Sequence, residues 1–326
     1  MKLIFIFLDG VGLASKSDKN PFSLTPQKCI KKSLTKECLL EEATLREPKR
    51  VFLPISASLG ISGAGQSGTG QFSIYTSQNG AKLFGKHFGP YLPTPLRALL
   101  IENNIFKMLK AIGKKICYAN AYPESFIQRC LSLRTVGKIR SSVLFEIAVL
   151  EKVELRSLTH LQKNKAVSGD ITNEWWQRNV GHHGLNIIPP EVAAEHLLAL
   201  TEEYDAVFYE FFLTDLVGHQ RLLIEPARIV ECLDRFLGKI FECLHDNMLF
   251  VMTSDHGNFE DLSTTQHTQN AVPLLVLGKG AEFFYTTKSI DEVAKTTLQA
   301  LQAVESKSCV DDKKLYSPCH IQRCAC

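Results

Sequence analysis

The sequence predicts an α/β protein with a doubly wound, mostly parallel sheet, helices on both faces and a smaller inserted α+β cap. Two observations lead to this prediction. Apolar runs of the length of buried strands end in polar residues or glycine, and amphipathic helical patterns alternate with them. The chain has 326 residues, of which 45% are hydrophobic, and this is enough to bury a large core.

The predicted strands are residues 3–8, 206–212 and 248–253, with a shorter one at 273–277. Residues 190–204 have apolar side chains at helical spacing, and we expect a helix there. Residues 28–50 mix charged and apolar side chains, which predicts one or two amphipathic helices on the surface.

The middle of the chain interrupts this alternation. Residues 114–119 favour a strand and residues 141–150 favour a helix, so we expect residues 89–186 to fold as an inserted cap. The core then comprises residues 1–88 and 187–305. The remaining residues, 306–326, are predicted to be a flexible tail. Its metal-binding side chains, Cys319, His320, Cys324 and Cys326, do not have the spacing of a zinc site.

The composition narrows the class of partner. The formal charge is +3, from 37 basic and 34 acidic residues, which does not favour a nucleic-acid partner. The apolar run at 3–8 is too short for an export signal, and no run has the length of a membrane span. Ten cysteines without paired spacing in the body of the chain favour reduced thiols. We therefore expect a cytoplasmic protein with a small-molecule partner.

Side chains that bind metals stand next to the predicted strands. Ligands of doubly wound sheets bind at the carboxyl ends of the strands, so these side chains should converge. Three Asp and three His residues gathered at one sheet edge need cations to offset repulsion and desolvation, which predicts two divalent metals. The residues are Asp9 after the first strand, Asp215 and His219 after the second, Asp255 and His256 after the third, and His267 before the fourth.

A glycine-rich segment at 60–71 supplies hydroxyl groups. Glycines allow a close approach to phosphate, and a following helix would point its amide groups at the anion. The segment lacks the lysine of a P-loop. Two interpretations stay open, an anion cradle and a flexible turn.

Four blocks resemble the alkaline-phosphatase superfamily, in particular the branch of cofactor-independent phosphoglycerate mutase and phosphopentomutase. They are residues 7–12, 65–71, 215–219 and 253–260, the last followed by His267-Thr268 and Val272-Pro273. The blocks occur in the order of that family and cover about residues 1–85 and 200–280.

The resemblance implies a ligand set and a nucleophile. Aligning the glycine-rich block places Ser67 at the nucleophile position, and Thr69 is the alternative. The implied metal ions are manganese or zinc. One would be held by Asp9, Asp255, His256 and the oxygen of Ser67, and the other by Asp215, His219 and His267.

The resemblance is weaker for the residues that would bind the substrate. The mutases usually have His where Gln71 stands. The candidate substrate contacts are Gln71, Arg129 and Arg134. Further candidates are Arg140, His182 and His183. For the arginines a purely solvated role remains an alternative.

These features predict two-metal phosphoryl transfer on a small phosphorylated metabolite through a phosphoserine, by a phosphomonoesterase or a phosphomutase. A phosphodiesterase and a non-catalytic metal-binding scaffold remain alternatives. A sulfatase does not fit, because no Pro or Arg follows Ser67 at the required positions. The sequence does not predict the oligomeric state.

Overall fold

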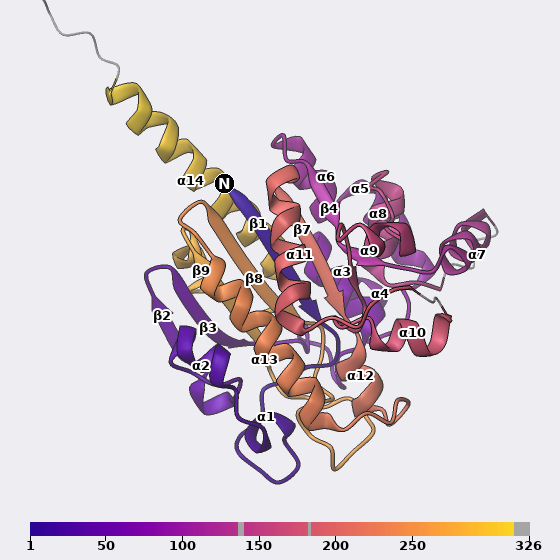
Figure 1. Ribbon diagram of the computed structural model, residues 1–326. Coiled ribbons are helices and arrows are strands. Elements are labelled where there is room, and N and C mark those ends of the chain that lie inside the picture. Colours follow the sequence, from indigo (N-terminus) through magenta and orange to yellow (C-terminus); the bar gives the residue numbers. More distant parts are fainter. Residues whose placement is uncertain (136–139, 182–183, 316–326) are drawn as a thin grey trace, which may run out of the picture.

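The computed structural model describes residues 1–135, 140–181 and 184–315 (Figure 1). Its main sheet has seven strands in the order β2-β3-β9-β8-β1-β7-β4. The strands of this sheet are β1 (Lys2–Leu8), β2 (Leu45–Glu47), β3 (Arg50–Ile55), β4 (Ile116–Tyr118), β7 (Ala206–Phe211), β8 (Met248–Ser254) and β9 (Val272–Gly278). A second sheet pairs β5 (Asn120–Ala121) with β6 (Val167–Ser168).

Helices connect these strands. They are α1 (Pro21–Leu24), α2 (Lys28–Leu34), α3 (Ser67–Thr76), α4 (Gly80–Phe84), α5 (Arg97–Glu102), α6 (Ile105–Ala111), α7 (Glu124–Thr135), α8 (Val143–Leu150), α9 (Leu158–Gln162), α10 (Glu174–Val180), α11 (Pro190–Glu203), α12 (Leu213–Gly218), α13 (Pro226–Cys243) and α14 (Val293–Leu315). The strands predicted near residues 3, 206, 248 and 273 are confirmed, as is the helix predicted at 190–204.

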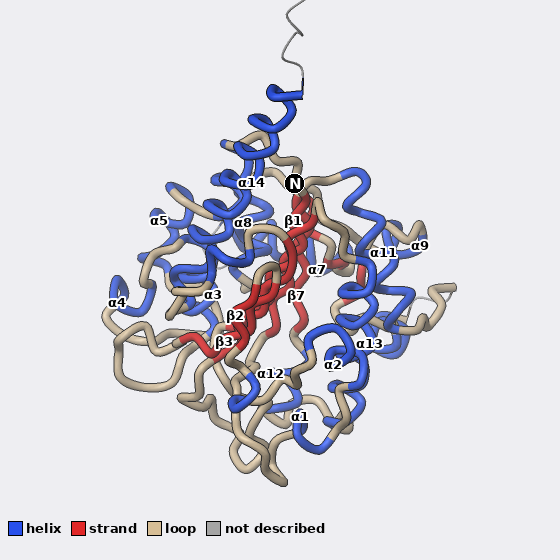
Figure 2. The backbone as a smooth tube through the Cα atoms, turned by 90° about the vertical axis from the view of Figure 1, so that its left-hand side faces the viewer, coloured by secondary structure: helices blue, strands red, loops and turns tan. Residues whose placement is uncertain are grey.

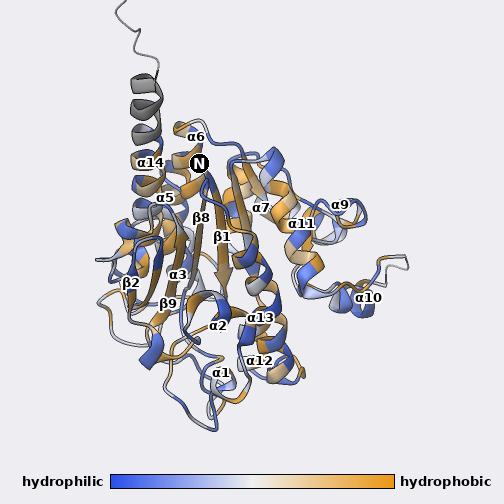
Figure 3. Cartoon of the chain, turned by 60° about the vertical axis from the view of Figure 1, so that its left-hand side comes forward, coloured by the Kyte–Doolittle hydropathy of each residue, from blue (hydrophilic) through white to orange (hydrophobic). Residues whose placement is uncertain are grey.

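Both faces of the sheet are covered, as the doubly wound prediction requires. Leu3, Phe5 and Phe7 of β1 share a buried cluster with residues of α3, α6, α8 and α14. The alternate residues Ile4 and Ile6 belong to a second cluster with α2, α11 and α13. Figure 2 shows helices on either side of the strands, and Figure 3 shows the central strands in hydrophobic colours. Burial on both faces explains the continuous apolar runs.

The prediction for residues 28–50 is correct only for its first part. Helix α2 is present and a short 3-10 helix follows at Leu40–Glu42, but β2 and the start of β3 occupy the end of the segment. Strand β3 pairs antiparallel with β9, and β9 pairs antiparallel with β8. The apolar segment 51–53 therefore lies between β9 and the edge strand β2.

The structure also changes the predicted insert. Strand β4 pairs in parallel with β7 of the main sheet, and α5, α6 and α8 contribute to the first buried cluster. The boundary at residue 89 therefore does not separate two cores. A smaller buried cluster lies around β5 and β6. A cap formed by part of residues 89–186 stays a prediction. That cluster contains Ala121, Leu161, Ala166, Trp176 and Leu185.

The C-terminal region differs from the predicted tail, because α14 continues past residue 305 to Leu315. The Cys319, His320, Cys324 and Cys326 group lies outside the described residues. The cysteines whose side chains the structure describes are free thiols, namely Cys29, Cys38, Cys117, Cys130, Cys232 and Cys243. None of the helices in that part is long and apolar enough to cross a bilayer.

Candidate metal centre

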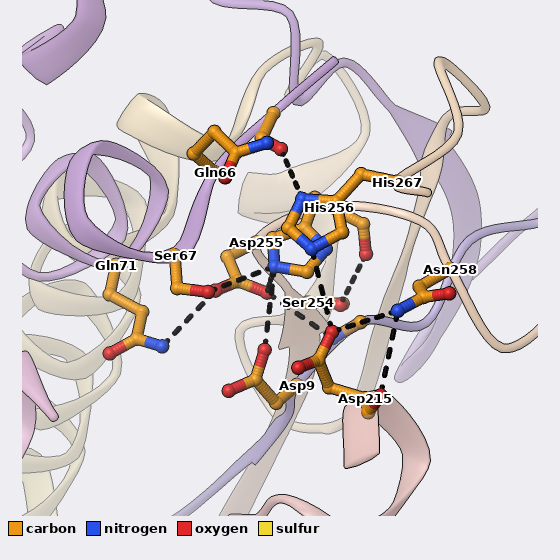
Figure 4. Close-up of polar contacts among 12 residues, drawn as sticks. Asp9, Gln66, Ser67, Gln71, Asp215, Ser254, Asp255, His256, Asn258 and His267 are labelled. Atoms are coloured by element: carbon orange, nitrogen blue, oxygen red, sulfur yellow. Dashed lines mark hydrogen bonds and ion pairs between the residues drawn. The ribbon is translucent and has the colours of Figure 1, made fainter. Parts of the chain in front are cut away.

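The candidate ligands gather at one edge of the sheet (Figure 4). Asp9 directly follows β1, Asp255 and His256 directly follow β8, and Asp215 lies in α12 after β7. Strand β1 runs parallel to both β7 and β8. The three strands therefore end side by side, and their carboxyl ends deliver these four side chains to the same place.

His267 reaches this edge for a different reason. It precedes β9, which was interpreted as another strand of a parallel sheet, and a parallel strand would place it at the opposite edge. β9 instead runs antiparallel to β8. An isolated antiparallel bridge between Gly257 and Thr268 holds the segment before β9 against the segment after β8. The reversed direction of β9 is what brings His267 to the other ligands.

The first group of candidate ligands surrounds the imidazole of His256. Its Nε2 lies 3.5 Å from Asp9 Oδ1, 3.6 Å from Asp255 Oδ1 and 3.0 Å from Ser67 Oγ. Asp255 and His256 are fully buried, and Asp9 is 8% exposed. Asp9 Oδ1 has no hydrogen-bond partner among the described residues. A buried carboxylate oxygen without a donor is costly, and a cation at this position removes the cost.

The second group adjoins the first. Asp215 Oδ1 lies 3.3 Å from His219 Nε2 and 3.6 Å from His267 Nε2, and the two imidazole nitrogens are 2.9 Å apart. The rings of His256 and His267 stack with their centroids 3.6 Å apart. His256 therefore connects the two groups.

The three histidines present the same nitrogen to the cluster. In each ring Nδ1 contacts a backbone carbonyl oxygen, which only accepts, so Nδ1 carries a proton, and once Nε2 is deprotonated its lone pair points inward. The lone pairs of His219 and His267 then face each other, which a cation between them would stabilise. The carbonyl partners of His219, His267 and His256 are Thr265, Gly65 and Gly257, at 2.7, 2.8 and 3.4 Å.

The electrostatics of the cluster also favour bound cations. Burial, and then the charges of Asp255, Asp215 and Glu210, raise the pKa of Asp9 well above its usual value. Burial also acts to raise the pKa of Asp215, but hydrogen bonding to His267 and nearby positive charge outweigh it and lower the pKa to about 2. Carboxylates packed this closely ionise together only beside positive charge. The oxygen and nitrogen donors fit two divalent metal ions.

Close packing explains two glycines of the glycine-rich segment. A Cβ atom at Gly68 would collide with the backbone oxygen of Tyr91, and one at Gly70 would lie 2.9 Å from Asp255 Cβ. Ser67 begins α3, so Gly70 lets the start of the helix pack against Asp255, and Gly68 lets the loop at Tyr91 pack against the same helix. The sequence predicts that these glycines permit the approach of a phosphate, and the structure gives Gly68 and Gly70 a packing role within the protein.

The hydroxyl of Thr69 is engaged away from the metal-binding groups. It donates to Gln66 O at 3.3 Å and accepts from Phe88 N at 3.2 Å, and Thr69 is fully buried. Thr69 thereby fastens the loop around residue 88 to α3.

Gln71 also has both polar ends occupied. Its Nε2 donates to Asp255 Oδ2 at 3.1 Å, and its Oε1 accepts from Val143 N at 3.2 Å. Gln71 therefore orients a candidate metal ligand and ties it to the start of α8. The predicted contact of Gln71 with a substrate stays a prediction.

Two cavities lie along the loop that packs on α3. The first, of about 280 Å³, contains the candidate nucleophile and is lined by Gln66, Ser67, Gly89, Pro90, Asp215, His219, Arg221, Gln266 and His267. The second, of about 470 Å³, is lined by Tyr91, Phe126, Arg129, Leu133 and Arg140. Successive residues of one loop, Pro90 and Tyr91, thus border the two cavities. Arg134 lies in α7, and its side chain, like His182 and His183, is outside the described part of the chain.

Sequence reasoning missed the residues that hold the site together. Glu260 is 1% exposed and accepts hydrogen bonds from Gly12 N and Asn258 N, each at 2.8 Å, and from the hydroxyl of Thr268. It joins the segments that follow β1 and β8 to the one that precedes β9. Asn258 in turn donates to Asp215 Oδ1 at 3.0 Å. Both residues stand in the block 253–260, but spacing alone does not reveal these contacts.

Comparisons with known proteins agree with the fold. Residues 186–305 match the family model of the Metalloenzyme superfamily. The PH0037 protein from Pyrococcus horikoshii superimposes with a TM-score of 0.53 and 11% identity over 92% of this chain and 97% of its own. Alkaline phosphatase from the Antarctic bacterium TAB5 gives a TM-score of 0.50 and 12% identity over 92% and 98%.

Curated relatives match a shorter stretch. The 2,3-bisphosphoglycerate-independent phosphoglycerate mutase of Ehrlichia ruminantium is 31% identical over 108 residues, which are 31% of this chain and 22% of that enzyme. The enzyme of the same name from Acetivibrio thermocellus is 37% identical over 87 residues, 24% of this chain and 17% of its own length. The matched stretch thus covers less than a quarter of the length of each of these relatives.

These findings support the resemblance at two levels. The fold is similar to that of an alkaline phosphatase. Residues 186–305, which contain Asp215, His219, Asp255, His256 and His267, carry the sequence pattern of the Metalloenzyme superfamily and resemble the phosphoglycerate mutase branch.

Proposed function

We propose that this protein is a metal-dependent phosphoryl-transfer enzyme, a phosphomonoesterase or phosphomutase, that acts on a small phosphorylated metabolite. One observation carries the proposal. Two adjoining groups of Asp and His donors share a sheet edge, and Ser67 Oγ lies 3.0 Å from His256 Nε2. The similarity to phosphoglycerate mutases and to an alkaline phosphatase supports this class of reaction.

Each group would hold one divalent ion, manganese or zinc. Asp9, Asp255, His256 and Ser67 Oγ would bind one, and Asp215, His219 and His267 the other. Bound metal ions would lower the pKa of the Ser67 hydroxyl and offset the charge of the phosphoryl oxygens.

Ser67 is the proposed nucleophile. Its Oγ gives up its proton and forms a bond to phosphorus while the ester bond to the leaving oxygen breaks, and the leaving oxygen takes up a proton. Ser67 stands at the first position of α3, where the positive end of the helix dipole favours a phosphate. Water then accepts the phosphoryl group in a phosphatase, whereas another substrate hydroxyl accepts it in a mutase. Thr69 is the weaker candidate, because its hydroxyl already binds Gln66 and Phe88.

The second cavity is the proposed site for the rest of the substrate. Arg129 lies over the ring of Phe126, 5.6 Å from its centroid, and Tyr91 and Arg140 line the same cavity. No carboxylate in the described part of the chain forms an ion pair with either arginine. This pairing of positive charge with aromatic faces suits a metabolite with a second anionic group.

Elemental analysis combined with turnover tests the proposal. After reconstitution with manganese or zinc, the protein should hold about two metal ions per chain and release or transfer phosphate from p-nitrophenyl phosphate or from a member of a panel of phosphorylated metabolites. Metal ions without turnover on any substrate would favour a non-catalytic scaffold, and turnover of diesters alone would favour a phosphodiesterase. A protein that binds no metal ion contradicts the proposal.

A further inference from the structure

Arg221 stands out in the first cavity because it is the only Lys or Arg among the described residues that line it. The neighbouring polar groups are Ser67, Asp215, two histidines and two glutamines. Arg221 is exposed, and no carboxylate in residues 1–135, 140–181 and 184–315 forms an ion pair with it. Its guanidinium is therefore available to an anion in this cavity.

The backbone holds Arg221 beside two candidate metal ligands. Helix α12 ends at Gly218, and Gln220 adopts a left-handed conformation with φ of 55°. This turn lets Arg221 N donate to Leu216 O at 2.9 Å. The chain after His219 thus folds back onto the helix that carries Asp215, and Arg221 stays at the cavity instead of continuing away from it.

The chemistry of the cavity indicates what this arginine binds. A phosphate monoester brings a dianion into a cavity that the carboxylate of Asp215 already lines. Guanidinium binds phosphoryl oxygens in a planar, two-pronged geometry and keeps its charge at every physiological pH. We propose that Arg221 binds the non-bridging oxygens of the phosphoryl group that Ser67 attacks. This inference rests on the proposed function and adds a specific phosphate-binding residue to it.

Binding of inorganic phosphate to the metal-loaded protein tests this inference without turnover. We would compare wild type, Arg221→Gln, Arg221→Lys and the control Arg235→Gln by calorimetry, and measure the metal content of each. Arg235 pairs with Glu191 on the outside of α13, away from the cavity. Loss of a charged hydrogen-bonding partner should weaken phosphate binding by about ten- to a hundredfold in Arg221→Gln. The phosphate affinity of Arg221→Lys should lie between those of wild type and Arg221→Gln, and the affinity of the control should match that of wild type.

The outcomes separate this inference from the proposed function. Wild-type phosphate affinity in Arg221→Gln, with both metal ions retained, overturns the role of Arg221 and leaves the proposed function standing. The same holds if phosphate affinity is unchanged and only the KM of substrates with a second anionic group rises, since Arg221 would then bind that group. Metal-loaded wild-type protein that binds no phosphate overturns both.

Discussion

Glu210 is a buried carboxyl group whose ionisation should contribute to the pH dependence of stability. It lies in β7, is fully buried, and accepts hydrogen bonds from Ser142 Oγ at 2.8 Å, from Tyr75 at 3.4 Å and from the hydroxyl of Tyr118. Burial raises its pKa from 4.5 to about 7, although these hydrogen bonds act to lower it. The folded protein therefore holds the Glu210 proton more tightly than the unfolded chain does.

The sign and size of the effect follow from linkage. Between pH 4.5 and about 7 the folded state binds more protons than the unfolded state at Glu210. The free energy of unfolding therefore falls as pH rises through this window, and the loss is complete above pH 7. A difference of 7 − 4.5 = 2.5 in pKa corresponds to about 3 kcal/mol. Glu210→Gln removes this ionisation and should remove that part of the pH dependence.

Urea unfolding of the metal-free protein in chelator, from pH 5 to pH 8, measures the effect. Compared with wild type, Glu210→Gln should lose about 3 kcal/mol of the fall in unfolding free energy between these limits. The control Glu202→Gln, at an exposed position of α11, should keep the wild-type slope. An unchanged slope in Glu210→Gln would refute a raised pKa at this residue.

Three further substitutions test the site. His267→Ala should reduce metal content to about one ion per chain by elemental analysis, and full content would reject this ligand assignment. Gln71→Leu removes the hydrogen bond to Asp255 Oδ2 and should weaken metal affinity about tenfold in a chelator competition; unchanged affinity would show that this contact does not orient the ligand. Gly68→Ala should destabilise the fold by about 1–3 kcal/mol in denaturant because of its collision, whereas Gly169→Ala, with open space around it, should be much milder. Equal effects of the two alanines would count against the packing argument.

Periodicity predicted most of the sheet because its central strands are buried on both faces and read as apolar runs. Strand β3 was not predicted, because it begins with Arg50 and contains Pro54, which has no N–H to donate to a neighbouring strand. The structure tolerates Pro54 because β2 pairs with β3 only as far as Phe52, and Pro54 lies opposite Pro273. The neighbouring charged stretch had been attributed to a helix, and only sheet pairing decides otherwise.

The candidate ligands were predictable because strand ends carry them in recognisable blocks. The supporting contacts were not. Gln71 contacts Asp255 across 184 positions of the sequence, and Glu260 joins separate loops through backbone groups that spacing does not reveal. The position of His267 depends on the direction of β9, which the apolar pattern suggested to be parallel and which is antiparallel to β8. The placement of β4 in the main sheet also depends on a long-range pairing.

The most direct test of the central claim is to locate the phosphoryl group. The metal-loaded protein would be incubated with a phosphate ester that it turns over, quenched in acid, digested and mapped by mass spectrometry, with Ser67→Ala and Thr69→Ala in parallel. Two-metal transfer through Ser67 predicts a phosphate on Ser67 in wild type and in Thr69→Ala, and none in Ser67→Ala. A phosphate on Thr69, or full turnover by Ser67→Ala, would contradict the account.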